Sequence, residues 1–200
     1  RSLIGEKAVL DAADVATRSA GVWRPDNLQA AALARPANTE EVSRVLRWCH
    51  ANKVGVVTQG GLTGLVHGGD AAPDQVILSL ERMRAIEDIN PQQRTATVQA
   101  GVTLQALQEA VEEHQLMFPL DLGARGTATL GGNAATNAGG NRVIRYGMMR
   151  DMVLGLEAVL ADGTVVSSLN HLIKNNAGYD LKQLFMGSEG TLGVITRLVL

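Results

Sequence analysis

Apolar residues recur at helical spacing early in the chain. Within residues 38–50, Val42, Val45 and Cys49 fall on one side of a helix. Asn38 stands where an N-terminal cap belongs, and Glu41 follows three residues later, as in a capping box. The spacing therefore predicts a helix that begins at Asn38 and turns Cys49 toward the core.

Two further helices are indicated downstream. Thr103 and Asp180 are each placed to cap a helix that carries an apolar face. The apolar residues are Leu104, Leu107 and Val111 in the first helix, and Leu181, Leu184 and Phe185 in the second.

Short apolar or alternating runs predict the strands. The runs cover residues 54–58, 75–80, 94–100, 153–160, 164–167 and 192–200. The run at residues 94–100 alternates as in a strand with one buried face, and Asp162-Gly163 joins two runs as a hairpin. Strands with a few intervening helices imply an α+β fold.

The expected domain organisation follows from the same pattern. Residues 1–34 carry little signal and are treated as an N-terminal extension, while residues 35–200 form one domain. A modest break at residues 83–91 would divide it into a smaller βαβ unit, residues 35–88, and a larger, more antiparallel sheet, residues 89–200.

Composition excludes several classes of protein. The formal charge is -2, and there are only two residues each of Phe, Tyr and Trp, so a nucleic-acid-binding surface is not expected. No apolar run is long enough for a membrane span. Cys49 is the single cysteine, which leaves no internal disulfide, and the four histidines form no close metal-binding pair.

Residues 123–147 are rich in Gly, Ala, Thr and Asn. They contain two glycine doublets, Gly131-Gly132 and Gly139-Gly140, and no acidic residue occurs between Asp121 and Asp151. Four arginines lie in that gap: Arg125, Arg142, Arg145 and Arg150. Flexible backbone with free N–H groups and no negative charge favours an anion site, for example for a pyrophosphate. The alternative is a set of surface turns.

A second glycine-rich stretch, residues 59–69, follows a predicted strand directly. A P-loop would need a Gly-Lys dipeptide, which the sequence lacks. A Rossmann turn would open a helix, whereas further glycines and Pro73 follow here; Glu81, at the distance of a ribose ligand, is weak support. The remaining interpretation is a loop that offers N–H groups to a phosphate with no helix behind it.

Several blocks of the sequence resemble one family. The blocks are RPANTEEV, VVTQGGLTGLV, VILSLERM, VQAGVTL, FPLDLGARG, LGGNAATNAGGNRVIRYG, VLGLEAVLADGTVV and AGYDLKQLFMGSEGTLGVIT. Their order, from Arg35 to Thr196, is similar to that of the PCMH-type, or vanillyl-alcohol-oxidase-type, FAD-binding domain, and within it to the FAD-linked D-2-hydroxyacid dehydrogenases. The resemblance implies FAD as cofactor and a domain of two α/β subdomains.

The resemblance also implies cofactor-binding positions. The loop of residues 59–65 would wrap the FAD pyrophosphate, residues 131–140 would line the flavin and its ribityl and phosphate tail, and the last strand would pass the adenine side. The implied residues are Gln59, Gly60, Gly61, Leu62, Thr63, Gly64, Leu65, Ser79, Leu122, Gly123, Gly131, Gly132, Asn133, Thr136, Asn137, Gly139, Gly140, Tyr146, Gly193 and Ile195.

The sequence departs from the family pattern at two positions. Leu62 stands where Asn is common and where relatives with covalent flavin carry a nearby His, so non-covalent FAD is expected. His67 interrupts a stretch that is often plain Gly-Gly, and a tolerated loop substitution is expected there.

The implied reaction is oxidation of a D-2-hydroxy acid, D-lactate or D-2-hydroxyglutarate, to the 2-oxo acid by hydride transfer to flavin N5. Substrate-binding and catalytic groups, with a metal in some members, would come from a C-terminal domain that this sequence does not include. No catalytic or metal-binding residue is therefore expected within residues 1–200, and this portion alone is expected to be inactive. The alternatives are another oxidoreductase of the same flavin fold, such as a glycolate oxidase subunit or an aldonolactone oxidase, and a non-catalytic nucleotide-binding module.

The expected partners are a small 2-hydroxy acid and an electron acceptor: a quinone, a cytochrome or an electron-transfer flavoprotein. No nucleic acid is expected, and a homodimer is left open. A cytoplasmic location is expected, with peripheral attachment to a membrane as the alternative.

Overall fold

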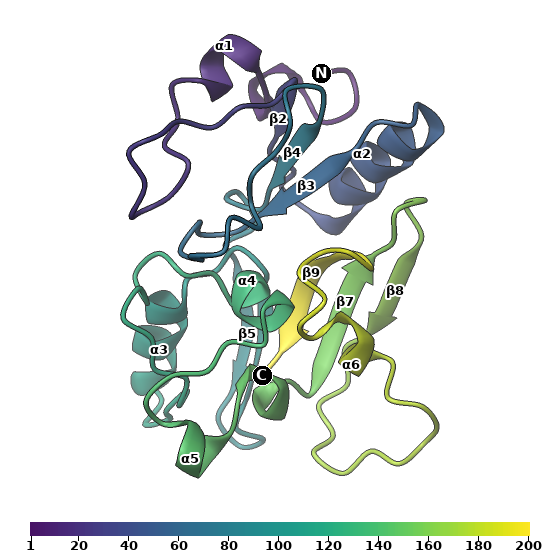
Figure 1. Ribbon diagram of the computed structural model, residues 1–200. Helices are drawn as coiled ribbons and strands as arrows, with labels where there is room; N and C mark the ends of the chain where they lie inside the picture. The colour runs from purple at the N-terminus through teal and green to yellow at the C-terminus, as the bar shows by residue number, and fades with distance from the viewer.

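The computed structural model describes residues 1–200, and its strands form two separate sheets (Figure 1). The first sheet has the order β1 (Val9–Asp11), β2 (Ala32–Ala34), β4 (Val76–Ser79) and β3 (Val56–Gln59). Here β2, β4 and β3 run parallel, and β1 pairs antiparallel with β2. The second sheet is antiparallel, with the order β5 (Ile86–Asn90), β6 (Thr95–Gln99), β9 (Val194–Val199), β7 (Gly155–Val159) and β8 (Val165–Ser168). The α+β fold is confirmed.

The helices are mostly short. They are η1 (Glu6–Ala8), α1 (Ala12–Val15), α2 (Thr39–Ala51), α3 (Leu104–Glu112), α4 (Leu130–Ala135), α5 (Val143–Tyr146), η2 (Met149–Met152) and α6 (Lys182–Phe185). Helix α4 packs on β9, while α2 and α6 pack on β7 (Figure 1). None of these helices has the length and apolar character needed to cross a lipid bilayer.

Helix α2 forms as its sequence predicts. The Asn38 side chain accepts a hydrogen bond of 2.9 Å from the Glu41 N–H, and Cys49 is buried. The Glu41 carboxylate reaches back to the N–H of Ala37 rather than to that of Asn38, so the capping box is displaced by one residue. Burial raises the pKa of the Cys49 thiol, which fits a structural cysteine.

One hydrophobic cluster joins the two sheets. It contains Ala34 and Leu78 from the first sheet and Val98 and Leu156 from the second. A smaller cluster, which includes Val15 and residues of the N-terminal segment, packs beside the first sheet. Because the larger core runs from one sheet to the other, the sheets hold each other in place, and residues 9–34 supply two strands of the first sheet.

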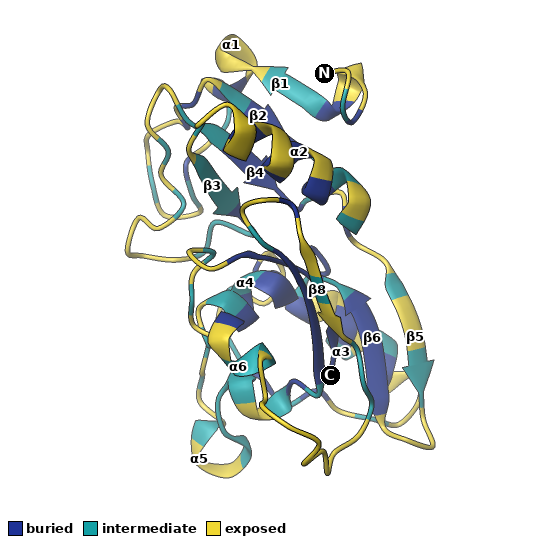
Figure 2. Ribbon diagram, turned by 90° about the vertical axis from the view of Figure 1, so that its right-hand side faces the viewer, coloured by how far each residue is buried: buried dark blue, intermediate teal, exposed yellow.

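Strand β6 is buried on both faces, so the prediction of one exposed face is wrong (Figure 2). It is a central strand between β5 and β9, whereas β5 lies at the edge and is more exposed. The polar residue Thr95 tolerates burial because its hydroxyl lies 3.0 Å from Nδ1 of His171.

The start of α6 also differs from the prediction. Asp180 does not cap the helix; its carboxylate accepts bonds from Lys182 Nζ at 2.6 Å and Gln183 Nε2 at 3.1 Å, and α6 begins at Lys182. Only Phe185 of the predicted apolar face is buried, while Leu181 and Leu184 are exposed.

Candidate functional site

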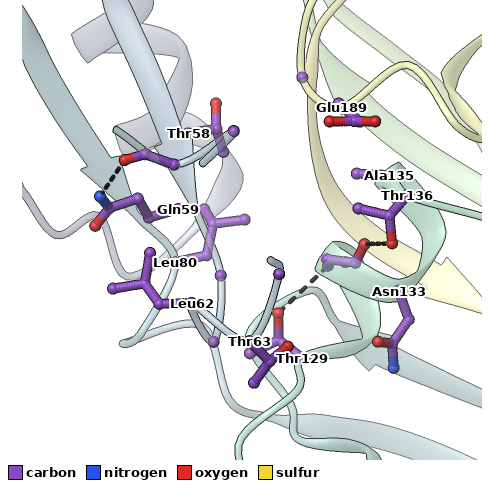
Figure 3. Close-up of a pocket in the computed structure, with 18 of the residues that line it drawn as sticks. Thr58, Gln59, Leu62, Thr63, Leu80, Thr129, Asn133, Ala135, Thr136 and Glu189 are labelled. Atoms are coloured by element: carbon purple, nitrogen blue, oxygen red, sulfur yellow. Dashed lines mark hydrogen bonds between the residues drawn. The ribbon is translucent and has the colours of Figure 1, made fainter. Parts of the chain in front are cut away.

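A pocket with a volume of about 410 Å³ lies where the two sheets meet. Its walls come from the segment that follows β3, from α4, and from the turn that leads into β9. Figure 3 shows Thr58 and Gln59 on one side of the pocket and Ala135, Thr136 and Glu189 on the opposite side. The size is that of a typical small-molecule site.

The loop at residues 59–70 forms one wall in a constrained conformation. Leu62 and His67 have positive φ angles of 52° and 62°, which are uncommon for residues with a side chain. The Gln59 side chain links the two ends of the loop, because its Nε2 donates to the Gly69 carbonyl at 2.7 Å. The backbone N–H groups of residues 60–69 have no acceptor within the chain. The loop therefore presents a row of free donors.

Helix α4 forms the facing wall, although the sequence predicted a loop there. Thr129 caps it by accepting a bond of 3.3 Å from the Gly132 N–H. A Cβ at Gly131 would lie 2.5 Å from the Cβ of Ala100, so glycine lets α4 approach the end of β6. The backbone N–H groups of α4 donate to acceptors within the protein. The N–H of Gly131, for example, donates to the Ala100 carbonyl at 2.8 Å.

Asn133 is the polar side chain of α4 that lacks a partner. The residue is 5% exposed, lines the pocket, and its Nδ2 donates to no protein atom. A buried amide donor without an acceptor costs free energy unless a ligand satisfies it.

The charged groups of the pocket do not form a cationic site. Arg24 is the arginine that lines it, and Asp70 and Glu189 contribute carboxylates. Hydrogen bonds from Arg24 lower the pKa values of both Asp26 and Asp70 below their ordinary range, and these bonds raise the pKa of the guanidinium in turn. The positive charge of Arg24 is therefore matched within the protein.

The arginines expected to surround an anion do not line this pocket. Arg142 lies 3.6 Å from the Asp121 carboxylate, and the guanidinium of Arg145 lies 5.2 Å from the ring centre of Tyr146. Arg150 donates to Gln183 and to the Met186 carbonyl instead. Electrostatic stabilisation of an anion here depends on backbone dipoles. None of the His, Cys, Asp and Glu side chains form a group that could hold a metal ion.

Most of the predicted site residues meet at this pocket. Those that line it are Gln59, Gly60, Gly61, Leu62, Thr63, Gly64, Leu122, Gly131, Gly132, Asn133, Thr136, Gly193 and Ile195.

The other predicted residues lie outside the lining, and they are Leu65, Ser79, Gly123, Asn137, Gly139, Gly140 and Tyr146. Ser79 is buried, and its hydroxyl donates to Glu81 at 3.2 Å. Glu81 also binds Arg18 and Arg35, so it is not free to act as a ribose ligand. Asn137 accepts a bond from the Arg150 N–H at 2.9 Å.

The individual positions predicted from the family resemblance leave out part of the lining. Some of these residues lie within the two glycine-rich stretches that were predicted as sites: Val66, His67, Gly68, Gly69, Thr129, Ala135 and Ala138. The others were missed: Ala20, Arg24, Thr58, Asp70, Leu80, Glu189, Gly190 and Val194. Thr129 could have been found as a helix cap. Glu189 lies in the sequence Gly187-Ser188-Glu189-Gly190, which is typical of a turn, but its φ of 52° and the bond from its N–H to the Ala135 carbonyl depend on the fold. Nothing in the sequence pointed to Arg24.

A family model described as "FAD binding domain" matches residues 30–168. A D-2-hydroxyglutarate dehydrogenase from Bos taurus mitochondria is 54% identical over 164 residues, which cover 82% of this chain and 30% of the relative. A D-2-hydroxyglutarate dehydrogenase from Xanthomonas citri is 48% identical over 178 residues, covering 89% of this chain and 37% of the relative. The chain thus spans about a third of the length of these relatives.

Solved structures share the fold. Alkyldihydroxyacetonephosphate synthase aligns with a TM-score of 0.75 at 26% identity, covering 86% of this chain and 31% of that one. A variant of Phl p 4 described as a glucose oxidase aligns with a TM-score of 0.81 at 20% identity, covering 100% of this chain and 42% of that one. The second likeness concerns the fold alone.

Proposed function

From the premise that this chain belongs to the FAD binding domain family, with FAD as its cofactor, we propose that it is the FAD-binding part of a D-2-hydroxyacid dehydrogenase. The names of the similar dehydrogenases support the substrate class. A putative D-lactate dehydrogenase from Schizosaccharomyces pombe is 47% identical over 82% of this chain and 31% of the relative. D-2-hydroxyglutarate is the first substrate to test, and D-lactate is the second.

The hydrogen-bond donors of the pocket match the acceptors that the FAD diphosphate would offer. The row of free amides at residues 60–69 is the observation that carries the proposal, because a diphosphate is bound well by convergent backbone N–H groups. The unpartnered Asn133 Nδ2 offers one more donor across the pocket. We assign residues 59–64 to the pyrophosphate, α4 with Leu122 to the flavin and its ribityl chain, and Gly193 with Ile195 to the adenine side.

The role of this chain in the reaction is to bind and orient. When bound, FAD supplies the two-electron oxidation that converts the hydroxyl-bearing carbon to a carbonyl. The loop amides stabilise the diphosphate charge without mobile cationic side chains, and the packing of α4 against β6 fixes the facing wall. None of the lining residues is assigned a proton-transfer role.

Non-covalent binding remains part of the proposal. Leu62 offers no nucleophile, and His67, the histidine in the pocket lining, has Nδ1 3.0 Å from Asp70. We also predict a cytoplasmic location and an electron acceptor that is a quinone, a cytochrome or an electron-transfer flavoprotein. A homodimer is the oligomeric state to test.

The test is the visible absorption spectrum of the intact protein before and after anaerobic addition of D- and L-2-hydroxyglutarate, D- and L-lactate, and glycolate. We expect a flavin band that bleaches with D-2-hydroxyglutarate or D-lactate, and release of all flavin on denaturation. A flavin band that no hydroxy acid bleaches would overturn the substrate class, and flavin retained on the denatured chain would overturn non-covalent binding.

A further inference from the structure

The segment at residues 19–27 precedes the region matched by the family model, yet it lies against the loop at residues 59–70, which is called the phosphate-binding loop below. Ser19 pairs with Asn27, so the segment forms a closed turn. The Val22 N–H donates to the Leu62 carbonyl at 3.4 Å, and Ala20 and Arg24 line the pocket. The segment therefore forms part of the site wall.

Within this turn, Arg24 joins two carboxylates. Its Nε donates to Asp26 Oδ1 at 2.9 Å, Nη2 binds the other oxygen of Asp26, and Nη1 binds Asp70. Asp26 belongs to the same turn as Arg24, whereas Asp70 ends the phosphate-binding loop. Of the bonds that Arg24 makes, the bond to Asp70 is therefore the one that ties the turn to the loop.

The conformation of the loop is strained and has few internal hydrogen bonds, so contacts from outside the loop help to fix it. Leu62 and His67 hold strained positive φ angles, and the amides of residues 60–69 make no internal hydrogen bonds that would fix their directions. Val22 holds the first part of the loop at Leu62, and Arg24 holds its end at Asp70. A loop fixed at both ends loses less conformational freedom when it binds a ligand.

We propose that Arg24 is a positioning residue for the phosphate-binding loop, acting through Asp70 rather than by direct contact with the FAD diphosphate. The inference rests on the proposed FAD site. It predicts that the two partners of Arg24 are not equivalent: Asp70 transmits the effect to the loop, and Asp26 only orients the guanidinium.

The test measures the FAD dissociation constant of the intact apoprotein by flavin fluorescence for Arg24→Gln, Asp70→Asn, Asp26→Asn and the Arg24→Gln/Asp70→Asn double variant. We expect Arg24→Gln and Asp70→Asn each to weaken binding about two- to fivefold, the scale of a well-formed exposed ion pair. The double variant should weaken binding by less than the product of the two single effects, because both single variants remove the Arg24–Asp70 bond. Asp26→Asn should have the smaller effect, and Arg24→Lys should recover part of the affinity.

Hydrogen exchange separates this role from a general loss of stability. In Arg24→Gln the amides of Val22 and Asp70, which donate to the Leu62 and His67 carbonyls, should exchange faster without FAD, while the thermal unfolding midpoint stays close to that of the wild type. Tighter FAD binding by Asp70→Asn would overturn the inference, since a released Arg24 would then be contacting the diphosphate. Unchanged affinity together with unchanged exchange of the Val22 and Asp70 amides in Arg24→Gln would also overturn it, whereas a wild-type protein that binds no FAD would overturn the proposed function.

Discussion

The two glycine-rich stretches resemble each other in composition and differ in what glycine does. In the loop at residues 59–70 the amides of residues 60–69 are free, and two residues with side chains take positive φ angles. At α4 the amides are bonded within the protein, and Gly131 is needed because Ala100 lies against it. The loop leaves its donors without acceptors in the protein, whereas glycine at α4 allows one element to pack closely on another.

A glycine-rich sequence therefore does not by itself mark a ligand loop. Substitution of the packed glycine at α4 should disturb folding first, whereas loss of a free donor group that lines the pocket should disturb binding first.

The largest expected effect is on folding, from Gly131→Ala. The added Cβ would lie 2.5 Å from that of Ala100 and 3.0 Å from the Ala100 carbonyl oxygen. We expect a loss of about 2–3 kcal/mol in the free energy of unfolding, as for an overpacked core, measured by denaturant titration. The matched control is Gly64→Ala, where a Cβ meets nothing within 4 Å and stability should stay unchanged. Equal losses in both variants would contradict the comparison.

The next effect is on binding, from Asn133→Ala. Because Asn133 Nδ2 has no protein partner, its removal should leave the apoprotein as stable as before. FAD affinity should fall by about 1–2 kcal/mol, the scale of a hydrogen bond to a ligand, measured by fluorescence titration. A loss of stability without a change in affinity would show that Asn133 belongs to the core rather than to the site.

Local signals made part of this architecture predictable. The cap of α2 and the Asp162-Gly163 turn of the β7–β8 hairpin depend on neighbouring residues, so the sequence carried them. Strands β1 and β2 were missed because each is only three residues long. Helix α4 was missed because glycine has low helix propensity, and the packing against Ala100 that favours it is long-range.

Some residues of the candidate site could likewise be predicted from the local sequence, and others could not. The residues of the loop after β3 were predicted from one contiguous stretch and its family resemblance, and they line the pocket. Arg24 enters the site from a distant segment through an ion pair with Asp70, which no local pattern records. The arginines within residues 125–150 were expected near the anion from the distribution of charge along the sequence, but none of them lines the pocket.

A smaller effect is expected for the dependence of FAD binding on salt concentration. The pocket holds no unmatched cationic side chain, so screening has little attraction to weaken. The FAD dissociation constant should change less than about threefold between low and high ionic strength, since backbone dipoles dominate. A steep weakening of binding with salt would show that arginine charges hold the diphosphate after all.

The smallest effect is the pH dependence of stability from Glu81, which lies outside both stretches. Burial alone would raise its pKa, but hydrogen bonds from Arg18, Arg35 and Ser79 outweigh burial and lower it below 4.5. A lowered folded-state pKa gives stability that is present above the unfolded value and is lost as pH falls through the folded value. Glu81→Gln should therefore be less stable than the wild type at neutral pH, and the difference should shrink below pH 4.5 in thermal unfolding. A difference that is constant with pH would contradict this account.

Amide hydrogen exchange of the intact protein with and without FAD would test directly whether FAD binds to the free amides of residues 60–69. We predict fast exchange of these amides in the apoprotein and strong protection when FAD binds, because the free donors acquire acceptors. The amides of α4 should be protected in both states. Protection by FAD that appears at α4 and leaves residues 60–69 unchanged would contradict the assignment of the two stretches.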